Sequence, residues 1–205
     1  KLQSEFLIGV AKKVSTIIIS RNVPGISHQC LRLDNFHAAY LATKHLIDLG
    51  HRQIAHITGL ITHPDANERR KGYSQALIDV GIDPNQDLII DGDYTESSGL
   101  MATEMLLARG RVFSAIFAAN DQMAIGARLA LYRRGFRVPE DVSIIGFDDQ
   151  ATTAYMTPPL TTVHFPALEM GNTAGKAILQ MIKGEEYTLP VIQTSLAIRE
   201  SVARR

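Results

Sequence analysis

The sequence predicts an α/β fold in which a parallel sheet is flanked by helices on both faces. Short apolar runs rich in β-branched residues alternate along the chain with longer helical stretches, and each helical stretch ends in a glycine. The apolar runs also lack the strict alternation of a strand that has one wet face. Alternating strands and helices are typical of βαβ units, and strands that are apolar on both sides belong to a sheet that is covered twice.

The apolar runs are the expected strands, and the stretches between them are the expected helices. The strands are 16–20, 54–57, 88–90, 115–119, 142–147 and 191–198. The helices are 36–49, 67–80, 97–109, 122–134 and 167–183, closed by Gly50, Gly81, Gly110, Gly135 and Gly184. Glycine is the residue best suited to the left-handed position just past a helix. Residues 1–13 read as the end of a helix already under way, so we expect an upstream part of the polypeptide.

Composition restricts the classes of protein that fit. With 205 residues, 45% hydrophobic and 20% charged, the chain has the profile of a globular protein. Its 21 basic and 21 acidic residues balance, so we expect any DNA contact to come from another segment. A single cysteine, Cys30, excludes an internal disulfide and fits a reducing compartment, so we expect a cytoplasmic protein. The apolar runs are too short to span a bilayer, and no secretory signal opens the chain.

A ligand site is expected where the strands end. In open parallel sheets ligands bind beyond the carboxyl ends of the strands, where loops converge and helix N-termini offer amide donors. Guanidinium, carboxylate and carboxamide groups can bracket the hydroxyls of a sugar, while an aromatic ring packs on its C–H face. Polar and aromatic residues of this kind follow the expected strands: Arg21, Asn22, Asp65, Arg69, Asp91, Asp93, Tyr94, Asn120, Asp121, Asp148 and Asp149.

Each of these residues also has a purely structural interpretation. Aspartate or asparagine in front of a helix commonly caps it, which applies to Asp121 and Asp149 taken alone. Tyr94 can pack beneath a loop, and Arg69 can belong to a solvated helix face. Only their common position at strand ends favours binding.

The sequence lacks the motifs of cofactor, metal and catalytic sites. There is no glycine-rich dinucleotide fingerprint, no Walker phosphate loop and no HExxH pair, and the seven histidines lack zinc-ligand spacing. His28 and Cys30 would point to the same side of a strand, but nothing marks an oxyanion hole, and no Gly-x-Ser-x-Gly elbow exists. We therefore expect no cofactor, no metal and no enzymatic activity.

Five stretches of the sequence resemble the LacI/GalR family of transcriptional repressors, and they occur in the family's order. They are LIDLGHRQIA at 46–55, NERRKGY at 67–73, ANDQMAIGA at 119–127, VPEDVSIIGFDD at 138–149 and PPLTTV at 158–163. Together they extend over nearly the whole chain. The variant Ser20-Arg21-Asn22 looks like the gal repressor branch, which favours a hexose or a hexose glycoside as the effector.

The resemblance implies a two-lobed, periplasmic-binding-protein-like fold, truncated at the N-terminal lobe, whose chain crosses three times between the lobes. Residues 1–33 would be the end of the N-terminal lobe and 34–163 the C-terminal lobe. Residues 164–190 would return to the first lobe, and 191–205 would form the final strand of the second lobe and a tail. The helix-turn-helix headpiece that binds operator DNA in this family would be absent from this chain.

The resemblance also implies a set of functional residues. Arg69 matches the family's effector-binding arginine, Asn120 and Asp148 its sugar-hydroxyl partners, and Tyr94 and Phe165 its aromatic walls. Arg21 occupies the strand end of the first lobe where some members carry an aspartate ligand. The implied homodimer surface is the helix that contains Met123, Ile125 and Leu129, together with the loop around Tyr155 and Met156. Core packing must account for part of that helix's apolar face in any case.

Two functions from different classes remain open from the sequence. The first is the effector-binding and dimerisation portion of a repressor of carbohydrate metabolism, in which a sugar shifts the arrangement of the lobes and so the affinity for DNA. The second is a periplasmic-type sugar receptor of a transporter, which would share the lobes and the rim residues. An upstream headpiece would favour the first and a signal peptide the second, and a dimer surface favours the first. A nucleobase effector also remains open.

Overall fold

The computed structural model describes residues 4–110 and 112–205, and these divide into two compact units. Unit 1 comprises the chain up to Asp34 together with Pro166–Thr194, and unit 2 comprises Asn35–Phe165 and Ser195–Arg205. The chain therefore passes between the units three times. The boundaries that the family resemblance implies lie after residues 33, 163 and 190, and the assignment of units to lobes stays a prediction.

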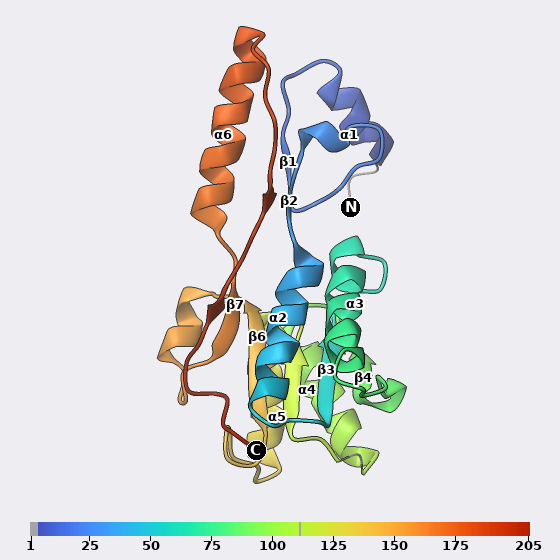
Figure 1. Ribbon diagram of the computed structural model, residues 1–205, viewed down its shortest axis with the longest axis vertical. Helices are drawn as coiled ribbons and strands as arrows, with labels where there is room; N and C mark the ends of the chain where they lie inside the picture. The colour runs from blue at the N-terminus through green and yellow to red at the C-terminus, as the bar shows by residue number, and fades with distance from the viewer. Residues whose placement is uncertain (1–3, 111) are drawn as a thin grey trace. The chain divides into compact units, whose positions relative to one another are not determined.

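Unit 1 is built on a small parallel sheet in the order β1-β2-β8. Its elements are α1 (Ser4–Ala11), β1 (Ile18–Ile19), η1 (Ser27–Gln29), β2 (Cys30–Leu33), α6 (Ala167–Lys183) and β8 (Val191–Ile192) (Figure 1). Of the helix expected over residues 1–13, Ser4–Ala11 is helical, and residues 1–3 lie outside the described part of the chain.

The loop that leads to β2 also decides how His28 and Cys30 lie. His28 is in the 3-10 turn η1, so it does not alternate with Cys30 along one strand as the nucleophile hypothesis requires. The Cys30 thiol is buried and donates to the carbonyl of Ile26 at 3.3 Å. Cys30 is therefore a small core residue of unit 1.

Unit 2 contains a six-stranded sheet in the order β4-β3-β5-β6-β7-β9. The strands are β3 (Ile54–Thr58), β4 (Ile89–Asp91), β5 (Ala115–Ala118), β6 (Ser143–Asp148), β7 (Thr161–His164) and β9 (Leu196–Ala197). The first five are parallel, as predicted, and β9 pairs antiparallel with β7. Every residue of β3 and β5 is buried, which agrees with a sheet covered on both faces.

Two helix pairs cover this sheet. They are formed by α2 (Asn35–Asp48), α3 (Pro64–Ile78), α4 (Glu96–Ala108) and α5 (Asp121–Arg133), and the short turns η2 (Gln86–Leu88) and η3 (Ala151–Tyr155) join other elements. Helix α2 packs beside α3, and α4 beside α5; in Figure 1 the first pair lies in front of the sheet and the second pair behind it. This is the arrangement that right-handed crossovers produce on the two faces of a parallel sheet.

The predicted helix ends are confirmed. All five glycines expected after helices have positive φ: 97° at Gly50, 76° at Gly81, 63° at Gly110, 80° at Gly135 and 72° at Gly184. These are the left-handed values that glycine adopts without steric cost.

The strand prediction was wrong at the C-terminal end. The run 191–198 forms two short strands in different sheets, β8 and β9, because the chain passes from one unit to the other between Thr194 and Ser195. Among the described residues, no helix is long and apolar enough to cross a membrane.

Candidate ligand-binding site at the carboxyl edge of the sheet

Arg69 is a buried cation at the carboxyl edge of the unit 2 sheet. It lies on α3, is 8% exposed, and its guanidinium carbon is 3.5 Å from the centroid of the Phe147 ring. Its Nε donates to Asn35 Oδ1 at 2.8 Å, and its Nη1 donates to the carbonyl of Ala119. These contacts fix the plane of the guanidinium, while Nη2 has no hydrogen-bond partner within the described chain. The alternative interpretation, in which Arg69 belongs to a solvated helix face, is therefore wrong.

Asp148 ends β6 and provides the carboxylate of the site. Its backbone has a φ of 115°, a region that residues with a Cβ rarely adopt. Burial raises the pKa of Asp148 to about 6, and the positive charge of Arg69 opposes this shift. No group of the described residues donates a hydrogen bond to its carboxylate, so both oxygens are available to a ligand.

Tyr94 and Asn120 lie together at the same edge. The Asn120 Nδ2 donates to the carbonyl of Tyr94 at 3.0 Å, while its Oδ1 caps α5 by accepting from the Met123 N–H at 2.9 Å. The Tyr94 ring stacks on His63, with centroids 5.6 Å apart. A Cβ at Gly59 would come within 2.1 Å of Tyr94 Cζ, so glycine is required where the ring lies against the chain just after β3. The capping role weighed for residues of this type is thus found at Asn120.

Phe165 and Arg21 complete the predicted set. Phe165 is half-buried and directly follows β7 at the carboxyl edge of unit 2. Arg21 belongs to unit 1, where it follows β1 and donates from Nη2 to Ser4 Oγ at 3.3 Å.

Three residues around Arg69 and Tyr94 escaped sequence reasoning: Asn35, His63 and Phe147. Asn35 stands at the start of α2 just after β2, and the strand-end argument misses it because the six expected strands do not include Cys30–Leu33, although the nucleophile hypothesis places Cys30 on a strand. Arg32 is exposed and breaks the apolar run there. Phe147 and His63 carry no signal, because a ring in a buried strand or a histidine in a loop is ordinary in any sequence.

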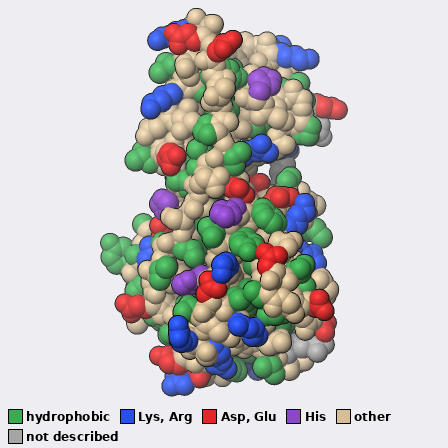
Figure 2. Space-filling model, in the orientation of Figure 1, with side chains coloured by type: hydrophobic (Ala, Val, Ile, Leu, Met, Phe, Trp, Pro, Cys, Tyr) green, Lys and Arg blue, Asp and Glu red, His purple; other side chains and the backbone are tan. Residues whose placement is uncertain are grey.

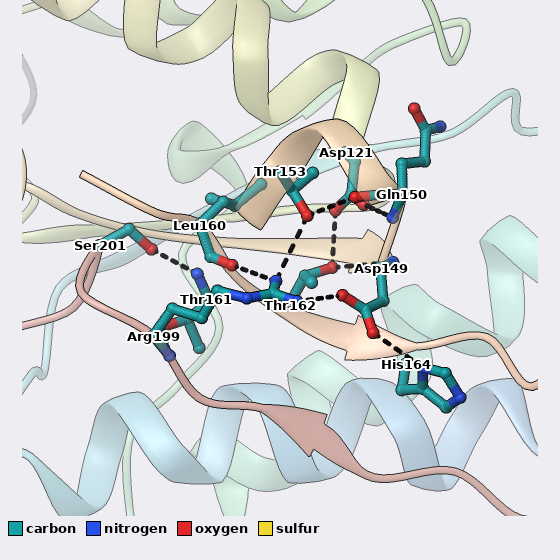
Figure 3. A network of polar contacts seen from close by, with 10 residues as sticks. All are labelled: Asp121, Asp149, Gln150, Thr153, Leu160, Thr161, Thr162, His164, Arg199 and Ser201. Carbon is teal, nitrogen blue, oxygen red and sulfur yellow. Dashed lines mark hydrogen bonds and ion pairs between the residues drawn. The ribbon is translucent and has the colours of Figure 1, made fainter. Parts of the chain in front are cut away.

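Asp121 and Asp149 do not cap helices, in contrast to the structural interpretation considered for them. Asp121 is fully buried; its Oδ1 accepts from Thr162 Oγ1 at 2.6 Å and its Oδ2 from the Gln150 N–H at 2.8 Å. Asp149 pairs with Arg199 at 2.5 Å and with His164 at 2.8 Å (Figure 3). The N-cap of α5 is Asn120, and the N-cap of η3 is Gln150, whose side chain makes no capping hydrogen bond.

The described residues contain no group of three or more His, Cys, Asp or Glu side chains that could hold a metal ion. On the face drawn in Figure 2, basic and acidic side chains are interspersed. The carboxyl edge presents the buried guanidinium of Arg69, the carboxylate of Asp148, the carboxamide of Asn120 and the ring of Tyr94. This set of groups suits a small polar ligand with hydroxyl groups.

A second feature of unit 2 is an apolar groove of about 770 Å³ that lies along α5. It is lined by Ile125, Arg128, Leu129, Tyr132, Phe136, Arg137, Val138, Glu140, Met156, Thr157 and Pro158. Three of the residues predicted for a dimer surface are in this set, and Tyr155, next to Met156, is 88% exposed. Met123 is different: it is fully buried in the core and offers no surface to a partner.

The comparison with known families gives the class of this α/β fold. A family model described as a periplasmic binding protein-like domain matches residues 43–202.

Relatives and solved structures narrow the class. The HTH-type transcriptional regulator GalR of Salmonella typhimurium (strain LT2) is 41% identical over 165 residues, which is 80% of this chain and 48% of GalR. The HTH-type transcriptional regulator AscG of Escherichia coli (strain K12) is 39% identical over 183 residues, 89% of this chain and 54% of AscG. The chain thus spans about half the length of the curated relatives it matches.

A solved sugar-binding transcriptional regulator of the LacI family from Escherichia coli, complexed with phosphate, superposes with a TM-score of 0.91 and 36% identity. The match covers 100% of this chain and 74% of that one. The Escherichia coli repressor ascG gives a TM-score of 0.87 and 36% identity, covering 98% of this chain and 75% of that chain. The chain belongs to the periplasmic binding protein-like domain family and, within it, to the LacI family of transcriptional regulators, as its motifs predict. The relatives named here are regulators rather than enzymes.

Proposed function

We propose that this chain is the effector-binding and dimerisation portion of a cytoplasmic, DNA-binding transcriptional repressor of carbohydrate metabolism. In this proposal unit 1 is the end of the N-terminal lobe with its returning segment, and unit 2 is the C-terminal lobe. Operator DNA is bound by a helix-turn-helix headpiece outside this chain.

The observation that carries the proposal is the state of Arg69. A buried cation is costly unless it is paired, yet no carboxylate of the described residues lies within ion-pair distance of this guanidinium. The stack on Phe147 and the bond to Asn35 hold it rigidly, with Nη2 left for a ligand. A preorganised donor of this kind binds a ligand without the entropy cost of ordering a long side chain.

A sugar fits the remaining groups. Adjacent hydroxyls can accept from Arg69 and Asn120 and donate to Asp148, and charged partners make such hydrogen bonds strong. The aromatic rings of Tyr94 and Phe165 supply apolar faces for the C–H side of the ring. Arg21 of unit 1 stays a proposed effector-binding residue on the ground of the family resemblance alone.

The proposed assembly is a homodimer that uses the α5 groove, with Ile125, Leu129, Tyr155 and Met156 on its surface. The names of the relatives favour the regulator over a periplasmic-type sugar receptor of a transporter, because GalR and AscG are transcriptional regulators. Another relative is the HTH-type transcriptional repressor PurR of Aliivibrio fischeri, 39% identical over 170 residues. A nucleobase effector, which the sequence leaves open, belongs in the ligand panel.

The test is calorimetric titration of a longer polypeptide that extends this chain upstream to the length of its relatives. The panel is D-galactose, D-glucose, D-ribose, a β-glucoside and hypoxanthine. We expect one sugar to bind, and Arg69→Ala to weaken it by about a hundredfold, since a hydrogen bond to a charged group contributes about 1.5–3 kcal/mol and the substitution removes a rigid cation as well.

The matched control is Arg70→Ala. Arg70 is the next residue of the same helix, but it donates from Nη2 to Gln86 Oε1 at 2.7 Å and not to Asn35 or Ala119, the partners of Arg69. Its loss should leave the affinity unchanged. Thermal unfolding of both variants shows whether they fold. Full affinity in folded Arg69→Ala protein would refute the assignment of Arg69 to the binding site. Binding of hypoxanthine alone would refute the proposal that the effector is a sugar.

A further inference from the structure

We propose that Asp149, held by Arg199 and His164, is a positioning residue that sets the carboxylate of its neighbour Asp148 for the ligand. This inference rests on the proposed function, in which Asp148 accepts hydrogen bonds from a sugar. It concerns a different question, namely how an unfavourable backbone is held at the end of β6 when no ligand is present.

The backbone at this point is unusual for two residues in succession. Asp148 has a φ of 115° and Asp149 a φ of 53°, and neither is glycine. Such conformations persist only where the surrounding structure over-determines them, and they cluster at ligand-binding sites. A relaxed backbone at either residue would turn the Asp148 side chain, because its Cα–Cβ direction follows φ.

The side chain of Asp149 supplies the constraint. Its Oδ1 accepts from Arg199 Nη2 at 2.5 Å, and its Oδ2 accepts from His164 Nδ1 at 2.8 Å. Although burial alone would raise the pKa of Asp149, the hydrogen bonds from Arg199 and His164 hold it below its ordinary value. Both oxygens are therefore engaged by charged or polar partners within the protein, and Asp149 acts through its neighbour rather than on a ligand.

The partners of Asp149 are themselves fixed. Arg199 donates from Nη1 to the carbonyl of Leu160 at 2.8 Å, and its backbone N–H donates to Thr161 Oγ1 at 2.9 Å. The next residues along, Gln150 and Thr153, are also held, since the Gln150 N–H donates to Asp121 and Thr153 Oγ1 donates to the Gln150 carbonyl at 2.6 Å. Figure 3 shows these contacts converging on the turn after β6. Asp149, Arg199 and His164, which we call the clamp, are thus anchored in β7 and in the C-terminal segment.

The same clamp reaches two of the three chain crossings. His164 is followed by Phe165 and then by the crossing at Pro166, and Arg199 lies a few residues after the crossing at Ser195. A ligand bound to Asp148 therefore contacts a turn that is hydrogen-bonded to His164 before one crossing and to Arg199 after the other.

The experiment measures sugar affinity in the longer polypeptide by calorimetry, with D-galactose or whichever sugar of the panel the wild type binds. We expect Asp149→Asn to weaken binding by about ten- to hundredfold, the value of a lost hydrogen bond to a charged group. His164→Ala removes one of the two partners of Asp149. Because the His164 side chain is exposed, the variant should fold, and it should weaken binding less than Asp149→Asn does. The matched control is Glu104→Gln, which breaks an arginine–carboxylate pair of unit 2 with Arg134, at the opposite end of α5 from the edge residue Asn120.

A double-mutant cycle separates positioning from general destabilisation. If Asp149 acts through Asp148, Asp149→Asn should cost no further affinity in protein that already carries Asp148→Asn. Unchanged affinity in Asp149→Asn, or an equal loss in both backgrounds, would overturn the inference.

A readout without ligand distinguishes this inference from the proposed function. The NMR Cα shifts of residues 148 and 149 report their positive φ, and we expect them to move in His164→Ala and to stay in Glu104→Gln. If the wild type binds no sugar of the panel, the proposed function fails while these shifts still decide the positioning role. Shifts that do not move in His164→Ala would refute it.

Discussion

Three neighbouring carboxyl groups at the carboxyl edge of unit 2 are in three different electrostatic states. Hydrogen bonds hold the pKa of Asp149 below its ordinary value against the effect of burial, burial raises that of Asp148 to about 6, and burial raises that of Asp121 to about 7. Gly146 makes room for the last of these, since a Cβ there would lie 2.2 Å from Asp121 Oδ1. Environments that push neighbouring pKa values apart are typical of functional sites.

The raised pKa of Asp121 predicts a stability that depends on pH. The unfolded chain loses this proton near pH 3.8 and the folded chain near pH 7. Between these values the folded state holds the extra proton, so the free energy of unfolding falls as pH rises, by up to about 4 kcal/mol from this group. Asp121→Asn should flatten the decline between pH 5 and pH 8 in urea unfolding.

The control for this prediction is Asp141→Asn. Hydrogen bonds from Arg137 lower the pKa of Asp141 to about 2, so its contribution is constant above pH 5 and its loss should leave the slope unchanged. Burial lowers the pKa values of His51 and His56, which makes the protein less stable as pH falls below 6.5, but this effect is common to all the variants. An unaltered slope in Asp121→Asn would contradict the assignment.

At this scale the strand-end rule predicted Arg69, Tyr94, Asn120 and Asp148 as a group, because parallel strands bring their carboxyl ends to one edge. It did not predict how each is held. Whether Asp121 caps a helix or bonds to Thr162 depends on the register of β7 against β6, which is a long-range pairing that no local pattern encodes.

The pair of helices α4 and α5 packs through backbone contact. A Cβ at Gly126 would come within 1.9 Å of the Glu96 carbonyl oxygen, and a Cβ at Gly99 within 2.1 Å of the Met123 carbonyl oxygen. The Met123 backbone takes part in this crossing and its side chain is fully buried in the core, with its Sδ 2.4 Å from the position of a Cβ at Gly92, so a residue expected on a dimer surface lies inside the molecule. Apolar residues occur on two sides of α5, and the sequence does not say which side meets α4.

Gly126→Ala should therefore destabilise the protein. The added methyl group meets backbone rather than a flexible side chain, so the helices must separate, at a cost of about 3 kcal/mol, the upper end for overpacking. The measurement is urea unfolding. Gly175→Ala on α6, where nothing lies within 4 Å, is the control and should stabilise by roughly 0.5–1 kcal/mol through helix propensity. Equal effects of the two substitutions would contradict the close crossing.

Among the elements, the helices were easier to predict than the strands. Five helix ends followed from glycine alone, since the left-handed position is a local requirement. The two-residue strands β8 and β9 could not be predicted separately, because they lie in one apolar run that is divided between the two units only in the folded structure. Helix α3 begins at Pro64, a residue suited to the first turn, rather than at residue 67.

The chain has no net charge, so association with a second copy meets no overall electrostatic repulsion. The α5 groove is largely apolar, with Leu129 42% and Tyr132 78% exposed. Arg128, Arg137 and Glu140 also line it, and a surface with both signs of charge can complement itself across a two-fold axis. Aromatic and aliphatic anchors with a charged rim are typical of stable interfaces.

Leu129→Glu should convert the proposed dimer into monomers. The substitution places a carboxylate among the apolar residues that line the groove, where an unpaired charge would be desolvated in a dimer, and we expect the dissociation constant to rise by about thirtyfold or more. Sedimentation equilibrium of the longer polypeptide measures this. Met101→Glu, at a methionine of α4 that is 61% exposed and outside the groove, is the control and should leave the mass unchanged. A wild type that sediments as a monomer at micromolar concentration, or a Leu129→Glu variant that stays dimeric, would show that the groove has another use.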